Sequence, residues 1–133
     1  MDATIKFCRK TGYVNNIFGR RTHINGINDK NYNIRNFQER AAINAPIQGS
    51  ASEIMRLAMI RLDKKFKSLK DTKSKILLQI HDELIFEVLD SEVKAMTKII
   101  KDEMSSVTKS DLHLFSTPLT MDINIGDNWG ILH

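Results

Sequence analysis

Three consecutive polar residues, His81, Asp82 and Glu83, separate two apolar, β-prone runs. These runs, residues 76–80 and 84–88, predict two strands joined by a tight turn. A turn accepts Asp readily but requires neither His nor two adjacent carboxylates. Carboxylate oxygens are ligands that Mg²⁺ prefers, together with phosphate oxygens. We therefore predict that Asp82 binds a metal ion at a hairpin tip, with a plain solvated turn as the alternative.

A single carboxylate is only part of a site for phosphoryl transfer. Two metal ions about 3.5–4 Å apart need carboxylates that bridge them. Neighbouring strand residues point to opposite faces, so Asp82 and Glu83 are not expected to share both ions. A second carboxylate must come from elsewhere. A metal-dependent nuclease built on Asp82 is a weak alternative, because no second carboxylate motif is visible.

A second group of polar residues recurs at four-residue steps. Arg40, Asn44 and Gln48 would share one helix face if Pro46 only bends the backbone. Each side chain carries hydrogen-bond donors, and the minor groove shows purine N3 and pyrimidine O2 acceptors. Donors on this face would grip duplex DNA without reading its sequence. An ordinary exposed helix face is the alternative.

Positive charge is concentrated in the first part of the chain. Residues 1–75 hold 16 Lys and Arg against 6 Asp and Glu, a net charge of +10, whereas residues 76–133 hold 4 against 10, a net charge of −6. A basic segment suits a polyanion such as nucleic acid, although two solvated faces would look the same. Arg20 and Arg21 are candidates to contact phosphates, with a charged turn as the alternative.

The composition is that of one soluble domain. The chain has 133 residues, 41% hydrophobic and 27% charged. No apolar run of about 18 residues predicts a transmembrane helix, and residues 1–6 carry no secretory pattern. The single cysteine, Cys8, cannot form an internal disulfide, so a cytoplasmic location without a membrane partner is predicted. No P-loop, GxGxxG or GxSxG motif is present.

The first half of the chain predicts helices and one hairpin. Residues 2–10 predict a helix that ends before Gly12. The runs 13–18 and 21–24 predict a short hairpin, and residues 26–33, rich in Asn, Asp and Gly, predict a loop.

Two helices are predicted after this loop. The first covers about residues 35–45 and is interrupted by Pro46, which lacks a backbone N–H. The second begins near Ser50, where Ser50 and Glu53 fit a capping box.

The second half adds the central hairpin, a helix and a strand. The helix begins after a cap by Asp90 or Ser91, and residues 119–125 alternate as a half-buried strand. Trp129 is expected to be packed. The fold class is therefore α+β, with a small antiparallel sheet that has a central hairpin and is covered by about three helices.

Taken together, these residues resemble the bacterial polymerase-I-type (family A) DNA polymerases. The resemblance covers nearly the whole chain in order. It is carried by Gly12-Tyr13-Val14, Phe18-Gly19-Arg20-Arg21, Glu39 to Ala51, Gln79 to Glu87, Gly126-Asp127-Asn128-Trp129 and His133. It implies that residues 1–133 are the C-terminal part of a palm subdomain.

The resemblance also implies roles for single residues. Asp82 would be one of two catalytic aspartates that bind Mg²⁺, His81 would lie near the 3′ end of the primer, and Glu83 would support the site. A row of polar residues would follow the minor groove: Arg40, Asn44 and Gln48. The substrates would be deoxynucleoside triphosphates and primed template DNA.

The family motif with the other aspartate and the triphosphate-binding helix have no counterpart in these 133 residues. The isolated chain is therefore expected not to polymerise DNA. It is also expected to self-associate through an exposed sheet edge or apolar patch. A non-catalytic DNA-binding fragment is the alternative function.

Overall fold

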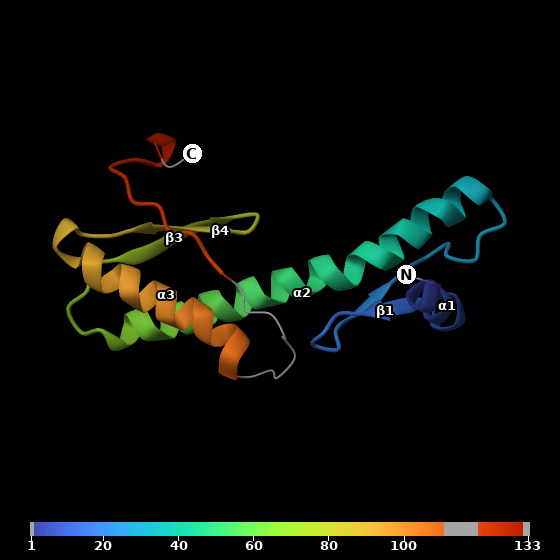
Figure 1. Cartoon of the computed structure of the whole chain (residues 1–133), viewed down its shortest axis with the longest axis horizontal. Coiled ribbons are helices and arrows are strands. Elements are labelled where there is room, and N and C mark those ends of the chain that lie inside the picture. The colour runs from blue at the N-terminus through green and yellow to red at the C-terminus, as the bar shows by residue number, and fades with distance from the viewer. Residues whose placement is uncertain (1, 111–119, 132–133) are drawn as a thin grey trace. The chain divides into compact units, whose positions relative to one another are not determined.

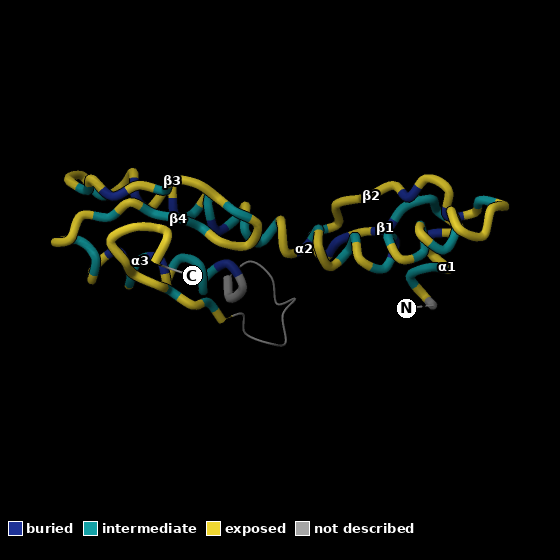
Figure 2. The backbone as a smooth tube through the Cα atoms, turned by 90° about the horizontal axis from the view of Figure 1, so that it is seen from above, coloured by how far each residue is buried: buried dark blue, intermediate teal, exposed yellow. Residues whose placement is uncertain are grey.

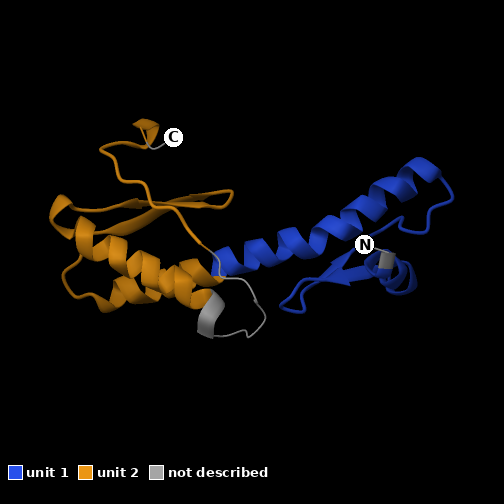
Figure 3. Ribbon diagram, in the orientation of Figure 1, with its two compact units in different colours: residues 1–56 blue, residues 57–133 orange. Residues whose placement is uncertain are grey.

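The computed structural model describes residues 2–110 and 120–131, and its architecture is α+β (Figure 1). The chain divides into two compact units, residues 1–56 and residues 57–133 (Figure 3). Among the described residues, each unit holds one antiparallel pair of strands. The predicted α+β class is confirmed, although the strands form two small sheets and not one.

The first unit opens with helix α1 (Asp2–Thr11), followed by the antiparallel strands β1 (Tyr13–Asn15) and β2 (Arg21–His23). The predicted helix and hairpin are confirmed. The helix ends at Thr11, and the N–H of the next residue, Gly12, donates to the carbonyl oxygen of Cys8 at 2.7 Å. The φ of Gly12 is 78°, in the left-handed region that glycine adopts without strain.

The apolar core of this unit joins α1, β1 and the first part of helix α2 (Tyr32–Ser68). Cys8 is fully buried in it, and this burial raises the pKa of the Cys8 thiol. Cys8 is therefore a packing residue. The other members of the core are Val14, Ile24, Ile27 and Ala42, with Ala41 and Ala45 packed against them.

Helix α2 is continuous through Pro46, which corrects the prediction of two helices. Proline removes one backbone N–H, so the helix loses the hydrogen bond to the carbonyl of Ala42, and the proline ring crowds that carbonyl. Ala42 is fully buried and Ala45 packs against the same core, so tertiary contacts hold the turn before the proline. Ser50 is not an N-cap, because its hydroxyl donates to the carbonyl oxygen of Pro46 at 2.6 Å.

Helix α2 also begins earlier than predicted, at Tyr32. Asn31 caps it: the side-chain oxygen of Asn31 accepts the N–H of Asn33 at 2.9 Å, and its carbonyl accepts the N–H of Arg35 at 3.0 Å. The segment predicted as a loop therefore ends at Asn31, and its asparagines include a helix cap.

The second unit contains strands β3 (Lys75–Ile80) and β4 (Glu83–Glu87) and helix α3 (Val93–Ser110). The predicted central hairpin and third helix are confirmed. In Figure 2 the two strands are coloured intermediate and exposed, whereas α3 also carries buried residues. The core combines residues of α2 and α3, Leu62, Phe66, Met96 and Ile100, with strand residues Ile76, Leu84 and Phe86 packed against them.

The start of α3 differs from the prediction. A 3-10 turn (Asp90–Glu92) precedes the helix, and Leu89 stands at its N-cap without a side-chain cap hydrogen bond. The predicted cap by Asp90 or Ser91 is therefore wrong. The side chain of Glu92 bonds instead to the connector before β3.

The predicted strand at residues 119–125 is wrong. Residues 120–126 form no strand, and Leu119 lies outside the described residues. Ile123 packs against the core of the second unit, but Ile125 is 65% exposed. Apolar and polar residues therefore alternate in this segment, but among the described residues it pairs with no other strand.

Trp129 begins a short 3-10 turn (Trp129–Ile131) and is 47% exposed, so the expectation that it is packed is wrong. Within the described part of the chain, no helix is both long and apolar enough to cross a membrane. The cytoplasmic location stays a prediction.

Candidate metal and nucleic-acid sites

The turn between β3 and β4 consists of His81 and Asp82, and both are exposed. Ile80 pairs with Glu83, so Glu83 is the first residue of β4. His81 has a φ of 51°, which is uncommon for a residue other than glycine. The side-chain amide of Gln79 donates to the carbonyl oxygen of His81 at 3.0 Å. A strained two-residue turn therefore presents the carboxylate of Asp82 to solvent.

This turn offers one protein ligand to a metal ion. In the regions that the structure describes, no three His, Cys, Asp or Glu side chains gather closely enough to hold a metal ion. Mg²⁺ binds proteins through as few as one or two carboxylates and completes its octahedron with water and phosphate oxygens. The exposed carboxylate of Asp82 fits one position in such a site.

The face of α2 that carries Arg40, Asn44 and Gln48 is exposed at all three positions. Because α2 runs without a break through Pro46, the spacing of four residues keeps these side chains on neighbouring turns. Pro46 therefore does not interrupt the helix, and the three side chains share one face, as the sequence predicted for that case. The face can offer guanidinium and amide donors to a ligand along two helical turns.

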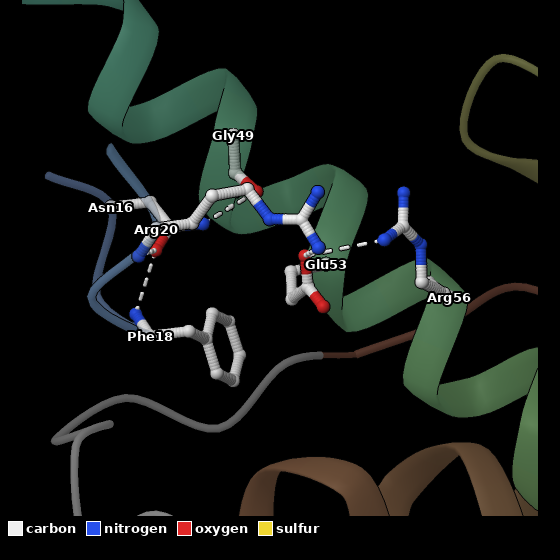
Figure 4. Close-up of polar contacts among 6 residues, drawn as sticks. All are labelled: Asn16, Phe18, Arg20, Gly49, Glu53 and Arg56. Atoms are coloured by element: carbon white, nitrogen blue, oxygen red, sulfur yellow. Dashed lines mark hydrogen bonds and ion pairs between the residues drawn. The ribbon is translucent and has the colours of Figure 1, made fainter. Parts of the chain in front are cut away.

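The turn between β1 and β2 is anchored by a buried asparagine (Figure 4). The side-chain oxygen of Asn16 accepts the N–H groups of Phe18 and Arg20, both at 2.9 Å. Its side-chain nitrogen donates to the carbonyl oxygen of Gly49, on α2, at 3.2 Å. Asn16 thus shapes the turn and ties it to the helix.

The two arginines of this turn are held differently. The guanidinium of Arg20 forms an ion pair with Glu53 at 3.0 Å. The guanidinium carbon of Arg21 lies 4.6 Å from the centroid of the Tyr13 ring, a cation–π contact that leaves the positive charge unneutralised. A phosphate would therefore be attracted more strongly to the guanidinium of Arg21 than to that of Arg20, which is paired with a carboxylate.

Asn16 and Glu53 are the residues of this site that sequence reasoning missed. Glu53 fitted a capping box with Ser50, and that role disappears when the helix is continuous. Asn16 precedes Phe18 by two positions, the spacing of an Asx turn, and this was the available signal.

A third polar cluster serves the fold of the second unit. The carboxylate of Glu92 accepts hydrogen bonds from the hydroxyls of Thr72, at 2.8 Å, and Ser74. These bonds, first that of Ser74 and then that of Thr72, hold the pKa of Glu92 below its usual value. The cluster fastens the connector before β3 to the turn before α3.

The described side chains form two separate groups, each within its own unit. Arg20, Arg21 and the polar face of α2 belong to the first unit, and His81, Asp82 and Glu83 belong to the second. Their roles stay predictions of the sequence.

Comparison with known proteins identifies the family to which the chain is similar. A family model described as DNA polymerase family A matches residues 1–131. DNA polymerase I of Streptococcus pneumoniae serotype 4 (strain TIGR4) is 43% identical over 129 residues, which are 97% of this chain and 14% of that protein. DNA polymerase I of Bacillus subtilis (strain 168) is 38% identical over 129 residues, again 97% of this chain and 14% of that protein.

A solved structure gives the same result. The POL domain of Pol1 from M. smegmatis, in complex with DNA primer-template and dNTP, matches with a TM-score of 0.76 and 38% identity. The match covers 80% of this chain and 19% of that one. The sequence resemblance is thus confirmed, and this chain belongs to DNA polymerase family A.

Proposed function

We propose that residues 1–133 form the C-terminal part of the palm of a DNA-directed DNA polymerase that acts in DNA replication or repair. Its partners are primer-template DNA and deoxynucleoside triphosphates, the classes named for the M. smegmatis structure. The observation that carries this proposal is the exposed His81–Asp82 turn in a chain whose family match extends over residues 1–131.

In this proposal the β3–β4 turn places a carboxylate at the reaction centre. Asp82 holds one metal ion, His81 lies near the 3′ end of the primer, and Glu83 supports the turn from the first position of β4. A bound Mg²⁺ supplies Lewis-acid stabilisation of charge on the phosphate oxygens. Because the turn is only two residues long, its backbone restricts where the carboxylate of Asp82 can point.

The first unit binds the primer-template duplex. Arg40, Asn44 and Gln48 donate hydrogen bonds to base edges in the minor groove, where acceptors occur in every base pair. Arg20 and Arg21 contact phosphates, which position the duplex without reading its sequence. The net charge of +10 over residues 1–75 supports a polyanionic ligand.

The isolated chain is proposed to be inactive in primer extension. Nucleotidyl transfer depends on metal ions and on groups that clamp the triphosphate, and the residues assigned here supply one metal carboxylate. The test incubates the purified chain with a labelled primed template, the four deoxynucleoside triphosphates and Mg²⁺. No extension is expected. Extension that the Asp82→Ala variant lacks would overturn the inactivity, because contaminating polymerase would act in both samples.

A non-catalytic DNA-binding role is the second candidate, and the basic first 75 residues favour it. Such a protein would bind primed and blunt duplexes equally, and Gln48→Ala would leave both affinities unchanged. A polymerase palm would instead lose affinity for the primed duplex when Gln48 is truncated.

We also propose that the isolated chain self-associates with a second copy through the β3–β4 sheet. Ile76, Leu84 and Phe86 pack against the core, whereas Leu77 and Leu78 are 47% and 41% exposed. Among the residues that the structure describes, β3 and β4 pair only with each other, and exposed leucines beside such strand edges favour pairing with another chain.

A further inference from the structure

The β1–β2 turn is fixed on α2 by backbone as well as side-chain contacts. The N–H of Ile17 donates to the hydroxyl of Ser50 at 3.2 Å, next to the Asn16–Gly49 bond. The turn and the helix are in ordinary van der Waals contact here, because a Cβ atom added to Gly49 would lie 3.5 Å from the Cβ of Asn16. The backbone of the turn is therefore held on the helix independently of any ligand.

Glu53 extends this anchoring along α2 to the side chain of Arg20 (Figure 4). The Glu53 carboxylate lies 3.0 Å from Nη2 of Arg20 and 3.9 Å from Nη1 of Arg56. The Glu53 side chain is only 17% exposed, whereas that of Arg20 is 55% exposed. A guanidinium carries five N–H donors, so Arg20 can pair with Glu53 on one side and still offer donors to a phosphate.

We propose that Glu53 is a positioning residue that holds the guanidinium of Arg20 ready to bind a DNA phosphate. The inference rests on the proposed function, since it takes duplex DNA as the ligand. An arginine loses rotamer freedom when it binds, and one that is already restrained loses less. The negative charge of Glu53 acts in the opposite direction, because it repels a phosphate. An experiment must therefore separate position from charge.

Two substitutions of Glu53 remove the same negative charge but differ in whether they can still position Arg20. Glu53→Gln keeps a side-chain acceptor for Arg20, whereas Glu53→Ala removes it. Fluorescence anisotropy with a labelled primed DNA duplex measures the affinity of the full chain. We expect the Ala variant to bind more weakly than the Gln variant by roughly two- to tenfold, the range that a single hydrogen bond contributes. In an Arg20→Ala background, this difference should vanish.

A matched control comes from the same helix. Asp63 pairs with Lys67 at 2.7 Å, and neither residue is assigned to the site. Asp63→Asn and Asp63→Ala should therefore bind the duplex equally. Equal affinities of Glu53→Gln and Glu53→Ala would overturn the inference, and so would a difference between them that persists without Arg20.

A measurement without DNA keeps the inference distinct from the proposed function. Nitrogen-15 relaxation at Nε of Arg20 should report restricted motion in the wild-type chain and in Glu53→Gln, and fast motion in Glu53→Ala. Failure of the wild-type chain to bind the duplex would overturn the proposed function. Equal Arg20 mobility in all three proteins would overturn the inference, whatever the affinity for DNA.

Discussion

The side-chain nitrogen of Asn16 lies 3.2 Å from the carbonyl oxygen of Gly49, a contact that crosses 33 positions of sequence. It joins the turn that carries Arg20 and Arg21 to the helix that carries Arg40, Asn44 and Gln48. The candidate phosphate contacts and the candidate minor-groove contacts are thereby linked within one compact unit.

Replacing Asn16 by alanine should destabilise the first unit by about 1–3 kcal/mol, the cost of leaving buried polar groups without partners. The change removes the acceptor of two backbone N–H groups and the donor to Gly49. Urea unfolding followed by circular dichroism measures the loss. Asn15→Ala is the control, because Asn15 is exposed, and its effect should stay within about 0.5 kcal/mol. Equal effects of the two substitutions would contradict the anchoring role.

Stability should depend on pH through Glu92. Its pKa is lowered in the folded chain, so its charged form stabilises the fold above the unfolded pKa, and this contribution is lost as pH falls through the lower folded pKa. The difference in unfolding free energy between wild type and Glu92→Gln should therefore shrink below a pH of about 4.5. Denaturation curves at a series of pH values test this. A difference that grows on acidification would contradict the assignment.

The two kinds of DNA contact should differ in salt dependence. Arg21→Ala should reduce the slope of log affinity against log salt by about 0.9, because one phosphate contact is lost. Gln48→Ala should weaken binding to a primed duplex with little change in this slope, because a neutral amide releases no counterion. Anisotropy titrations at several salt concentrations measure both. A slope unchanged in Arg21→Ala would remove that residue from the phosphate contacts.

Self-association should depend on the exposed leucines of β3. Replacing Leu78, which is 41% exposed, by lysine should shift the chain toward monomer, because a charge on the sheet opposes pairing. Sedimentation velocity across micromolar concentrations reports the change. Lys98→Glu is a suitable control for a change of charge, since Lys98 is exposed on α3. A wild-type chain that is already monomeric throughout would contradict the proposal.

The sequence predicted the elements well where a local pattern decides the structure. The hairpins and α1 follow from apolar runs and from Gly12, and the structure contains them. The predicted interruption of the helix at Pro46 is wrong, because the packing of Ala42 and Ala45 outweighs the cost of the proline. The predicted strand at residues 119–125 is wrong as well, because alternation cannot supply a partner strand.

The sequence predicted only those residues of the candidate site whose side-chain type itself indicates a chemical role. Asp82 and the donors of α2 stand out as functional side chains on exposed positions. Asn16 shows only the local spacing of an Asx turn, and the contacts that tie Asn16 and Glu53 across the first unit join residues more than thirty positions apart. Such contacts leave no periodicity in the sequence.

The central claim is that Asp82 is a metal ligand of a polymerase active centre. The most direct measurement grafts this chain in place of the matching residues of full-length Bacillus subtilis DNA polymerase I and records primer extension with Mg²⁺. We predict that the graft extends the primer, that Asp82→Asn lowers kcat by about 10²–10³-fold or more, and that Asp90→Asn leaves kcat unchanged. An active graft in which Asp82→Asn retains full kcat would contradict the claim.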